Sequence, residues 1–414
     1  MKLFDSLKHV RDGRDSGRIV IPLKVLLVGV LAMYWFQLPS LAALDDQLRH
    51  HSWLRRVLAP LGYGAAVADD TFRNAFAKLD ADGLHGILHQ IGRKLLKGWG
   101  AGRYRDSQLA RKLAPLGMQK LAGKLTIIID GHHLFETRHV ARTCNECLQR
   151  SVLVNGQHET AYYHHVLVAQ VMGAHPAVIL DFEPLLPGEN ELVAVRRLLP
   201  RLKEAYGERI GVVVADAMYD NEPFRRLVNA CDYRSVLVHK VDRSTYGKAA
   251  RAALDRRDPE RVRPDYKHHA GRGVHYHVWD QAAGGRRLIE VRRNDRSGKT
   301  WKSQALTDLP DDQIHAVAVG LLLESRWEVE NKGFKQLVED WNLDRAYVHA
   351  KKPRAVRAFV ALALLAYNAL HQFIYRVLGL DPVEPERALQ AVRRDLIHTL
   401  VDLGVRGPPH ARSP

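Results

Sequence analysis

The chain has 414 residues and carries 62 Lys and Arg against 46 Asp and Glu, which gives a formal net charge of +16. Hydrophobic residues make up 46% and charged residues 26% of the chain, a composition that is typical of a folded globular protein and excludes a disordered one. Lysine and arginine occur along nearly the whole length. A polyanion is therefore the expected partner, and nucleic acid fits this charge better than a membrane surface.

The cysteine count and the hydropathy pattern bear on the compartment. Three cysteines are too few for a secreted disulfide framework. The N-terminus lacks the pattern of a signal peptide. The most apolar stretch, residues 25–44, is interrupted by Gln37 and Pro39, so we expect a buried helix there and no membrane span. These features together predict a cytoplasmic protein.

The first part of the chain has the periodicity of helices. Stretches such as "LAALDDQLRHHSWLRRVLAPLG" place apolar residues at helical spacing, so residues 1–100 are predicted to form a helical DNA-binding region. Residues 101–123 begin in a segment rich in glycine and arginine and are predicted to be a linker.

From residue 124 the period changes to that of strands. Three strands are expected in "KLTIIID", "RSVLVNG" and "TAYYHHVLVAQVMG", followed by "PAVILDFEP", a helix capped by Asn190, the strand "RIGVVVAD", a helix and the strand "RSVLVHKV". This order predicts an α/β fold, a mixed sheet flanked by helices with an N-terminal helical domain. The sheet domain is assigned to residues 124–241 and 316–380, a basic insertion to 242–315 and a C-terminal tail to 381–414.

Two of the predicted strands end in a carboxylate. "LTIIID" closes on Asp130 and "VVVAD" closes on Asp216. On neighbouring strands these carboxylates would meet at one edge of the sheet, where they repel each other unless a cation lies between them. Mg²⁺ prefers such oxygen ligands. For Asp130 taken alone, the cap of a turn or helix is the alternative.

A third carboxylate, Glu330, follows in a predicted helix. Two Asp and one Glu can hold two Mg²⁺ or Mn²⁺ ions about 4 Å apart, an arrangement suited to phosphodiester chemistry. At about 100° per residue, Glu330 lies on the apolar face of this helix and Glu328 on the opposite, solvated face. An ion pair with Arg326, one turn earlier, is the structural alternative for Glu330.

The motifs "IIIDGHHLF", "EPLLPGENEL", "VVVADAMYDNEPF" and "RWEVENKGF" resemble those of the DDE transposases of bacterial insertion sequences, in the group with a Tyr-Arg-Glu-Lys signature. The resemblance implies an RNase H-like (retroviral-integrase-type) catalytic domain with two divalent ions. It also implies cleavage and strand transfer at terminal inverted repeats, a target DNA and a homodimer in the synaptic complex. By motif, Asp130, Asp216 and Glu330 take the catalytic positions, and Arg326 takes that of the signature Arg.

The sequence departs from this signature at two positions. Leu323 stands where the signature has Tyr, and Leu337 where it has Lys. The contacts to the DNA ends, and any hairpin step, therefore stay open. The candidate DNA-binding residues are Arg326, Lys332 and Lys335 near the catalytic helix, and Arg73 and Lys94 in the N-terminal helices.

A second candidate metal site contains the CxxC motif of Cys144 and Cys147, with His164 on a later strand. A zinc ion would require four such ligands to converge. Reduced structural thiols are the alternative reading of the same residues. Two alternatives to the transposase also stay open, namely a catalytically silent DNA-binding protein derived from one, and an RNase H-like nuclease without strand transfer.

Overall fold

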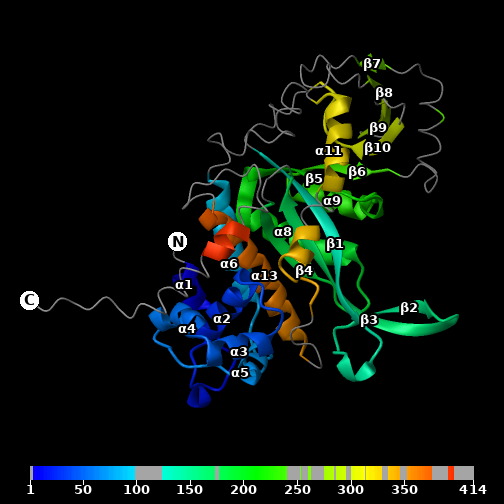
Figure 1. Ribbon diagram of the computed structural model, residues 1–414. Coiled ribbons are helices and arrows are strands. Elements are labelled where there is room, and N and C mark those ends of the chain that lie inside the picture. The colour runs from blue at the N-terminus through cyan, green and yellow to red at the C-terminus, as the bar shows by residue number, and fades with distance from the viewer. Residues whose placement is uncertain are drawn as a thin grey trace, which may run out of the picture.

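The protein is described by a computed structural model (Figure 1), which covers residues 3–97, 124–172, 177–239, 252, 260–262, 275–283, 286–294, 300–312, 314–328, 334–345, 352–374 and 390–395. The N-terminal region is helical, as expected. Its helices are α1 (Leu3–Ser6), α2 (Leu23–Trp35), α3 (Leu41–His50), α4 (Ser52–Leu58), α5 (Asp69–Phe76) and α6 (Asp82–Leu96).

The apolar stretch at 25–44 contains helix α2, which is buried around its whole circumference. This confirms the expected buried helix. The covering element is α13 (Pro353–Gln372), which packs against both α2 and α6. Tyr34 Oη donates to the Phe359 carbonyl at 3.0 Å, and Trp35 Nε1 donates to that of Ala366 at 3.0 Å. Among the described helices, α13 alone is long and apolar enough to cross a membrane, yet 83% of its apolar window is buried inside the protein.

Ten strands form one mixed sheet, which confirms the predicted α/β class. They are β1 (Leu125–Thr137), β2 (Leu148–Val154), β3 (Gln157–Val171), β4 (Ile179–Pro184), β5 (Ile210–Ala215), β6 (Arg234–Val238), β7 (Glu260–Val262), β8 (His275–Ala283), β9 (Arg286–Asn294) and β10 (Thr300–Thr307). The sheet order is β2-β3-β1-β5-β6-β10-β9-β8-β7, and β4 also pairs with β3. Strands β1, β5 and β6 are parallel, whereas β3 runs antiparallel to both β1 and β4.

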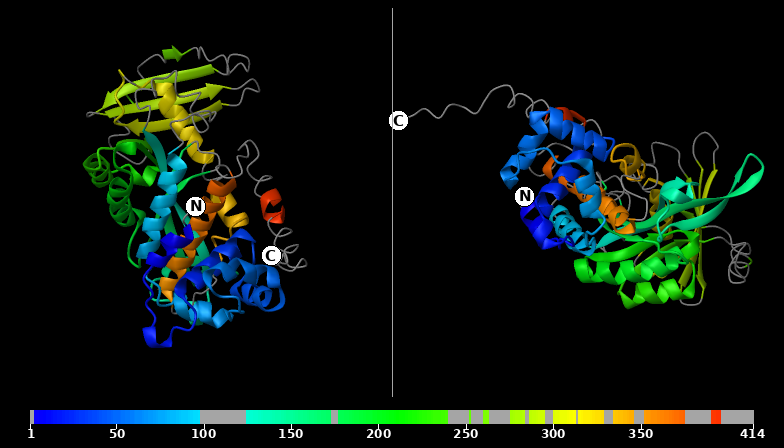
Figure 2. Two further views of the ribbon diagram at one scale, coloured as in Figure 1. Left: turned by 90° about the vertical axis from the view of Figure 1, so that its left-hand side faces the viewer. Right: turned by 90° about the horizontal axis from the view of Figure 1, so that it is seen from below.

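Helices cover both faces of this sheet. The connections α8 (Glu191–Tyr206) and α9 (Glu222–Ala230) join β4 to β5 and β5 to β6. Asn190 caps α8 by accepting from the Val193 amide at 3.1 Å, as the sequence predicted. Helix α11 (Ala316–Glu328) packs on β5, β6, β8, β9 and β10, and the short α12 (Lys335–Glu339) follows it. The two views of Figure 2 show α11 against the strands β8–β10 and the N-terminal helices around α13.

Strands β2 and β3 form a long hairpin that projects from the body (Figure 1). Its turn is Asn155–Gly156, whose φ angles of 50° and 81° are those of a type I′ turn. Only the second half of β3 is buried within the sheet, between β1 and β4. The hairpin base therefore lies where the projecting arm joins the core.

One prediction about β1 was wrong. The strand does not end at Asp130, because it continues through this residue to Thr137, paired with β3. The polar residues after Asp130 predict the end of the strand, but in the structure they continue to pair with β3 as far as Thr137.

Candidate active site

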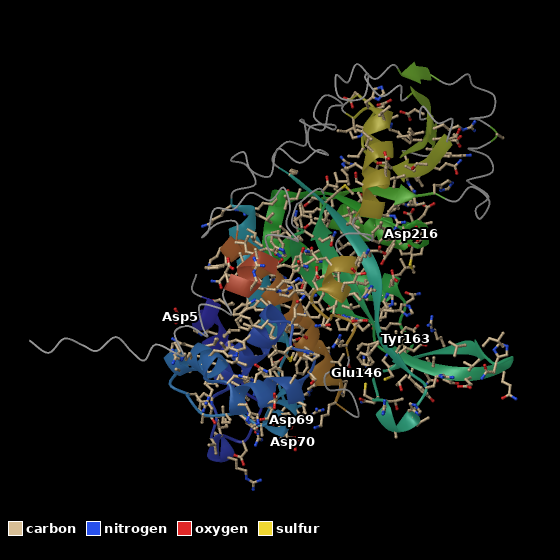
Figure 3. All side chains as sticks on the ribbon, in the orientation of Figure 1. Asp5, Asp69, Asp70, Glu146, Tyr163 and Asp216 are labelled. Carbon is tan, nitrogen blue, oxygen red and sulfur yellow. The ribbon has the colours of Figure 1, made fainter. Side chains whose placement is uncertain are left out.

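Asp130 of β1 and Asp216, the residue that directly follows the parallel strand β5, lie close to each other. Ile128 of β1 is in register with Val214 of β5, so two residues further along each strand Asp130 comes opposite Asp216. Side chains alternate between the faces of a strand. Both carboxylates therefore project on the face that contains Ile128 and Val214, and this is the face that α11 covers. Figure 3 shows Asp216 below α11.

Arg326, near the end of α11, lies over both aspartates. Its Nη1 is 3.8 Å from Asp130 Oδ2, and its Nη2 is 4.0 Å from Asp216 Oδ1. The arginine side chain is 9% exposed, whereas those of Asp130 and Asp216 are 19% and 38% exposed. The two carboxylates are thus open to solvent on one side and face a buried positive charge on the other.

Behind Asp130, on the opposite face of β1, lies a second polar group centred on Glu191. This first residue of α8 accepts hydrogen bonds from Tyr219 Oη at 2.6 Å and pairs with His165 Nε2 at 3.0 Å. Burial raises the pKa of Glu191, but the bonds from His165 and Tyr219 outweigh it, so the pKa lies below its usual value. Burial and this carboxylate raise the pKa of Tyr219 far above its usual range. The pair is therefore a carboxylate and a neutral phenol.

Gly131 allows this group to lie directly against β1. A Cβ atom at this position would come within 2.2 Å of His165 Nε2 and 2.3 Å of Glu191 Oε1. The glycine beside Asp130 is thus required by close approach of side chains and not by a left-handed backbone. Glu191, His165 and Tyr219 are members of this group that the sequence did not predict. The available signals were the "GHH" that follows Asp130 and the "PGENEL" motif.

A cavity of about 630 Å³ opens beside Glu191 and extends toward the hairpin base. Its walls include His133, Tyr163 and His165, with Cys147 and Glu189 further along. His133 stacks on Tyr163 with 4.6 Å between the ring centroids, and burial lowers the pKa of this histidine. The cavity wall near β1 thus combines stacked aromatic rings with the carboxylate of Glu191.

His132 is on the other side of β1, where its ring stacks on Phe334 with 5.0 Å between centroids. Burial, together with the neighbouring His165, lowers the pKa of His132 to about 4. The residue is therefore neutral at pH 7. Since Phe334 directly precedes α12, this stack ties β1 to the segment that follows α11.

The structure places the other predicted residues as follows. Glu330 and Lys332 lie outside the described residues, as do the side chains of Trp327 and Glu328. Phe334, Leu337 and Trp341 are buried and Lys335 is exposed, but α12 ends at Glu339, before Trp341. Leu323, at the signature Tyr position, is also buried.

The residues that are predicted to contact DNA lie in different parts of the structure. Arg326 is at the aspartates, not on an open surface. Arg73 pairs with Asp69 at 3.1 Å within α5, and Lys335 pairs with Glu339 at 3.8 Å within α12. Lys94 is half-buried in the last turn of α6.

A group of three soft ligands also converges at the hairpin base. Cys144, Cys147 and His164 are all buried, and their ligand atoms lie within 4.8 Å of one another. Within the described part of the chain, no other three His, Cys, Asp or Glu residues meet this criterion. The aspartate pair forms no such group with a third described residue, and Glu330 lies outside the described residues.

Two comparisons with known proteins are informative. Residues 154–369 match the family of the transposase DDE domain. A search of curated proteins finds no match. The matched region contains β3–β6, Asp216, Arg326 and Glu330, but it begins after Asp130. The link between Asp130 and the rest of the site therefore depends on the strand register between β1 and β5.

Proposed function

The chain belongs to the family of the transposase DDE domain, and from that premise we propose that it cleaves the ends of an insertion sequence and joins them to target DNA. The observation that carries the proposal is the juxtaposition of Asp130 and Asp216 beneath Arg326. Two carboxylates from adjacent parallel strands, partly open to solvent, are an unfavourable arrangement unless positive charge compensates them.

The donor set fits a hard divalent cation. Asp130 and Asp216 offer carboxylate oxygens, which Mg²⁺ and Mn²⁺ prefer over nitrogen or sulfur. Glu330, one helical turn after Arg326 in the sequence, is proposed as the third ligand. When bound, two such ions would activate a water or 3′-hydroxyl nucleophile and stabilise the leaving oxygen of a phosphodiester.

The residues of the chain have distinct parts in this proposal. Asp130 and Asp216 hold the cations, and their backbone positions are fixed by the paired strands β1 and β5. Arg326 lowers the repulsion between the two carboxylates and presents a guanidinium toward the phosphate. The buried pair of Glu191 and His165 packs against the face of β1 opposite to Asp130 and so supports the orientation of Asp130.

The substrate is proposed to be double-stranded DNA with terminal inverted repeats. The net charge of +16 supports a polyanion as partner. Arg73, Lys94, Lys332 and Lys335 are proposed to contact the phosphate backbone, together with the other lysine and arginine residues of the surface. A homodimer that synapses two ends, and a cytoplasmic location, complete the proposal.

The test is a cleavage assay with the full chain, Mg²⁺ or Mn²⁺, and duplexes taken from the DNA that flanks the gene. We expect the wild-type protein to cut at the repeat end and to join the end to a target duplex. Asp216→Asn should abolish cutting while DNA affinity stays within a few-fold, because phosphate contacts come from Arg and Lys. Asp232→Asn, at an exposed carboxylate whose left-handed φ of 56° also suits Asn, is the control and should cut normally.

The products distinguish the alternatives. Cutting without joining would indicate a nuclease without strand transfer, and sequence-specific binding without cutting would indicate a silent DNA-binding protein. Cutting by Asp216→Asn at the wild-type rate would contradict the assignment of the active site.

A further inference from the structure

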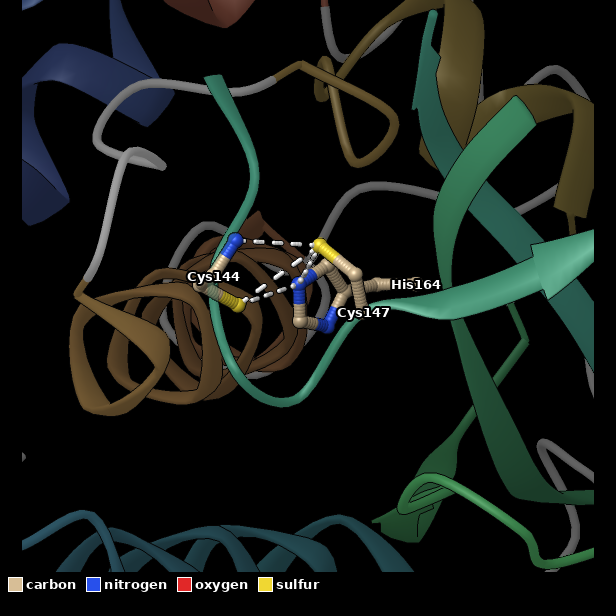
Figure 4. Close-up of side chains that lie close together, drawn as sticks. All are labelled: Cys144, Cys147 and His164. Carbon is tan, nitrogen blue, oxygen red and sulfur yellow. Dashed lines mark hydrogen bonds between the residues drawn. The ribbon is translucent and has the colours of Figure 1, made fainter. Parts of the chain in front are cut away.

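Cys144, Cys147 and His164 form a compact set of donors at the base of the β2–β3 hairpin (Figure 4). The two sulfurs are 3.7 Å apart, and His164 Nε2 is 3.2 Å from Cys144 Sγ and 3.6 Å from Cys147 Sγ. The two cysteines belong to the connection between β1 and β2, whereas His164 comes from the buried half of β3. Segments that are distant in sequence thus bring these atoms together.

The backbone from Cys144 to Cys147 forms a tight, hydrogen-bonded turn. The Cys147 amide donates to the Cys144 carbonyl at 3.2 Å, and the Cys144 amide donates to Cys147 Sγ at 3.3 Å. Amide donors that point at a sulfur stabilise negative charge on it, as they do around metal-bound thiolates. The sulfurs are far beyond the bond length of a disulfide, about 2.05 Å.

We propose that Cys144, Cys147 and His164 bind a zinc ion. Tetrahedral zinc with bonds of about 2.3 Å to sulfur and about 2.05 Å to nitrogen requires its ligands to be about 3.8 Å apart for two sulfurs and about 3.6 Å for sulfur and nitrogen. The observed separations of 3.7, 3.6 and 3.2 Å approach these values. Soft thiolates with an imidazole select zinc over Mg²⁺, so this site differs in chemistry from that of the aspartates.

Three protein ligands leave one coordination position. Within the described residues three donors converge, and a water molecule or a residue from elsewhere in the chain completes the four. Cys147 lines the cavity beside Glu191, so the zinc would lie at one end of that cavity.

The position of the proposed zinc site indicates how the ion would stabilise the base of the hairpin. Glu146, inside the CxxC motif, pairs with Arg357 of α13 at 2.7 Å. His164 and His165 are successive residues of β3 and so point to opposite faces, one toward the cysteines and the other toward Glu191. The zinc would thus fasten the base of the projecting hairpin to α13 on one side and to the candidate active site on the other.

The test measures metal in the purified full chain, so it does not depend on the proposed transposase activity. After expression with added zinc and dialysis, we expect about one zinc per chain by elemental analysis. Cys144→Ser and Cys147→Ser should each lose at least about nine-tenths of it, because a hydroxyl is a much poorer zinc ligand than a thiolate. Cys231→Ser removes the remaining buried cysteine, at the end of α9, and should keep the zinc.

Two further measurements keep the result unambiguous. Asp130→Asn should retain the zinc, which separates this site from the aspartates. Cobalt in place of zinc should give a thiolate charge-transfer absorption in the wild-type chain, and this measurement does not require either cysteine variant to fold. A wild-type chain without zinc or without this absorption would overturn the proposal, as would equal zinc loss in Cys231→Ser.

Discussion

Arg326 lies near the carboxylates of both Asp130 and Asp216 without a close contact to either. Its distances of 3.8 and 4.0 Å to their carboxylates are longer than charge-assisted hydrogen bonds. By comparison, Arg197 and Glu183 are in contact at 2.6 Å elsewhere in the protein. Arg326 thus compensates the carboxylates through space instead of binding either of them tightly. A metal cation can therefore replace Arg326 as the positive partner of these carboxylates.

The choice between Glu330 and Glu328 is tested by two conservative substitutions. We expect Glu330→Gln to eliminate Mg²⁺-dependent cleavage with the fold intact, because Glu330 shares the helix face of Phe334, Leu337 and the other core residues in the predicted register. Glu328→Gln, on the far side, should keep most of the activity. Circular dichroism verifies that both variants are folded, and the reverse ranking of their cleavage rates would show that the helix register is wrong.

Gly131→Ala tests the close approach of Glu191 and His165 to β1. The added methyl group would overlap both side chains, so we expect a loss of about 1–3 kcal/mol in the free energy of unfolding and slower cleavage. Urea unfolding followed by circular dichroism measures the loss. Gly64→Ala is the control, since nothing lies within 4 Å of its Cβ position, and it should change the stability by less than about 0.5 kcal/mol. Equal stability of the two variants would mean that the pair moves away without cost.

Helices α6 and α8 are joined to β4 by a buried polar cluster. Asp181 of β4 is fully buried and contacts His85 of α6 at 2.7 Å and Arg201 of α8 at 2.6 Å. The ring of His85 also stacks on Phe182, with 4.4 Å between centroids. Burial alone would raise the pKa of Asp181, but His85, His89 and Arg201 outweigh it and lower the pKa well below its ordinary value of 3.8. Two helices from different parts of the chain are therefore held to one strand by a single carboxylate.

This cluster predicts how stability depends on pH. Because the pKa of Asp181 is lower in the folded than in the unfolded protein, its contribution is complete above pH 3.8 and is lost as the pH falls below that value. Asp181→Asn should lower the free energy of unfolding by about 3 kcal/mol at pH 7, and less at acid pH. Asp5→Asn, at an exposed carboxylate paired with Lys8, should change it by less than about 0.5 kcal/mol. A constant difference between wild type and Asp181→Asn from pH 7 to pH 2 would contradict this account.

The N-terminal helices and the catalytic sheet share one hydrophobic core. Buried residues of α2, α6 and α13 belong to the same cluster as Ile127, Ile129 and Val213 of the sheet. Figure 2 shows α13 lying among the N-terminal helices although it follows the sheet in the chain. The helices within residues 3–97 thus pack on the sheet domain through this shared core.

A shared core predicts one cooperative unfolding transition. Leu27→Ala in α2 and Leu364→Ala in α13 both remove fully buried side chains, and each should lower the free energy of that transition by about 2–5 kcal/mol. Urea unfolding followed by near- and far-ultraviolet circular dichroism should give coincident curves for each variant. Two separate transitions, with Leu27→Ala affecting only one of them, would identify residues 1–100 as an independent domain.

Features that depend on a local pattern of residues are predicted correctly from the amino-acid sequence. Continuous apolar runs indicated β1, β5 and α2, the capping preference of Asn predicted the cap at Asn190, and the carboxylates after the apolar runs identified Asp130 and Asp216. Such signals lie within a few residues of chain, where side-chain alternation and capping are decided. The motifs also indicated the family, although Asp130 lies before the matched residues 154–369.

Which of these residues come together depends on long-range packing. The register of β1 on β5 places Asp130 opposite Asp216, and the packing of α11 brings Arg326 over both. The approach of Glu191 to Gly131, and that of His164 to the CxxC motif, likewise join segments that are far apart in the chain. These contacts arise from strand pairing and helix packing. Both depend on the whole core and cannot be predicted from a short stretch of sequence.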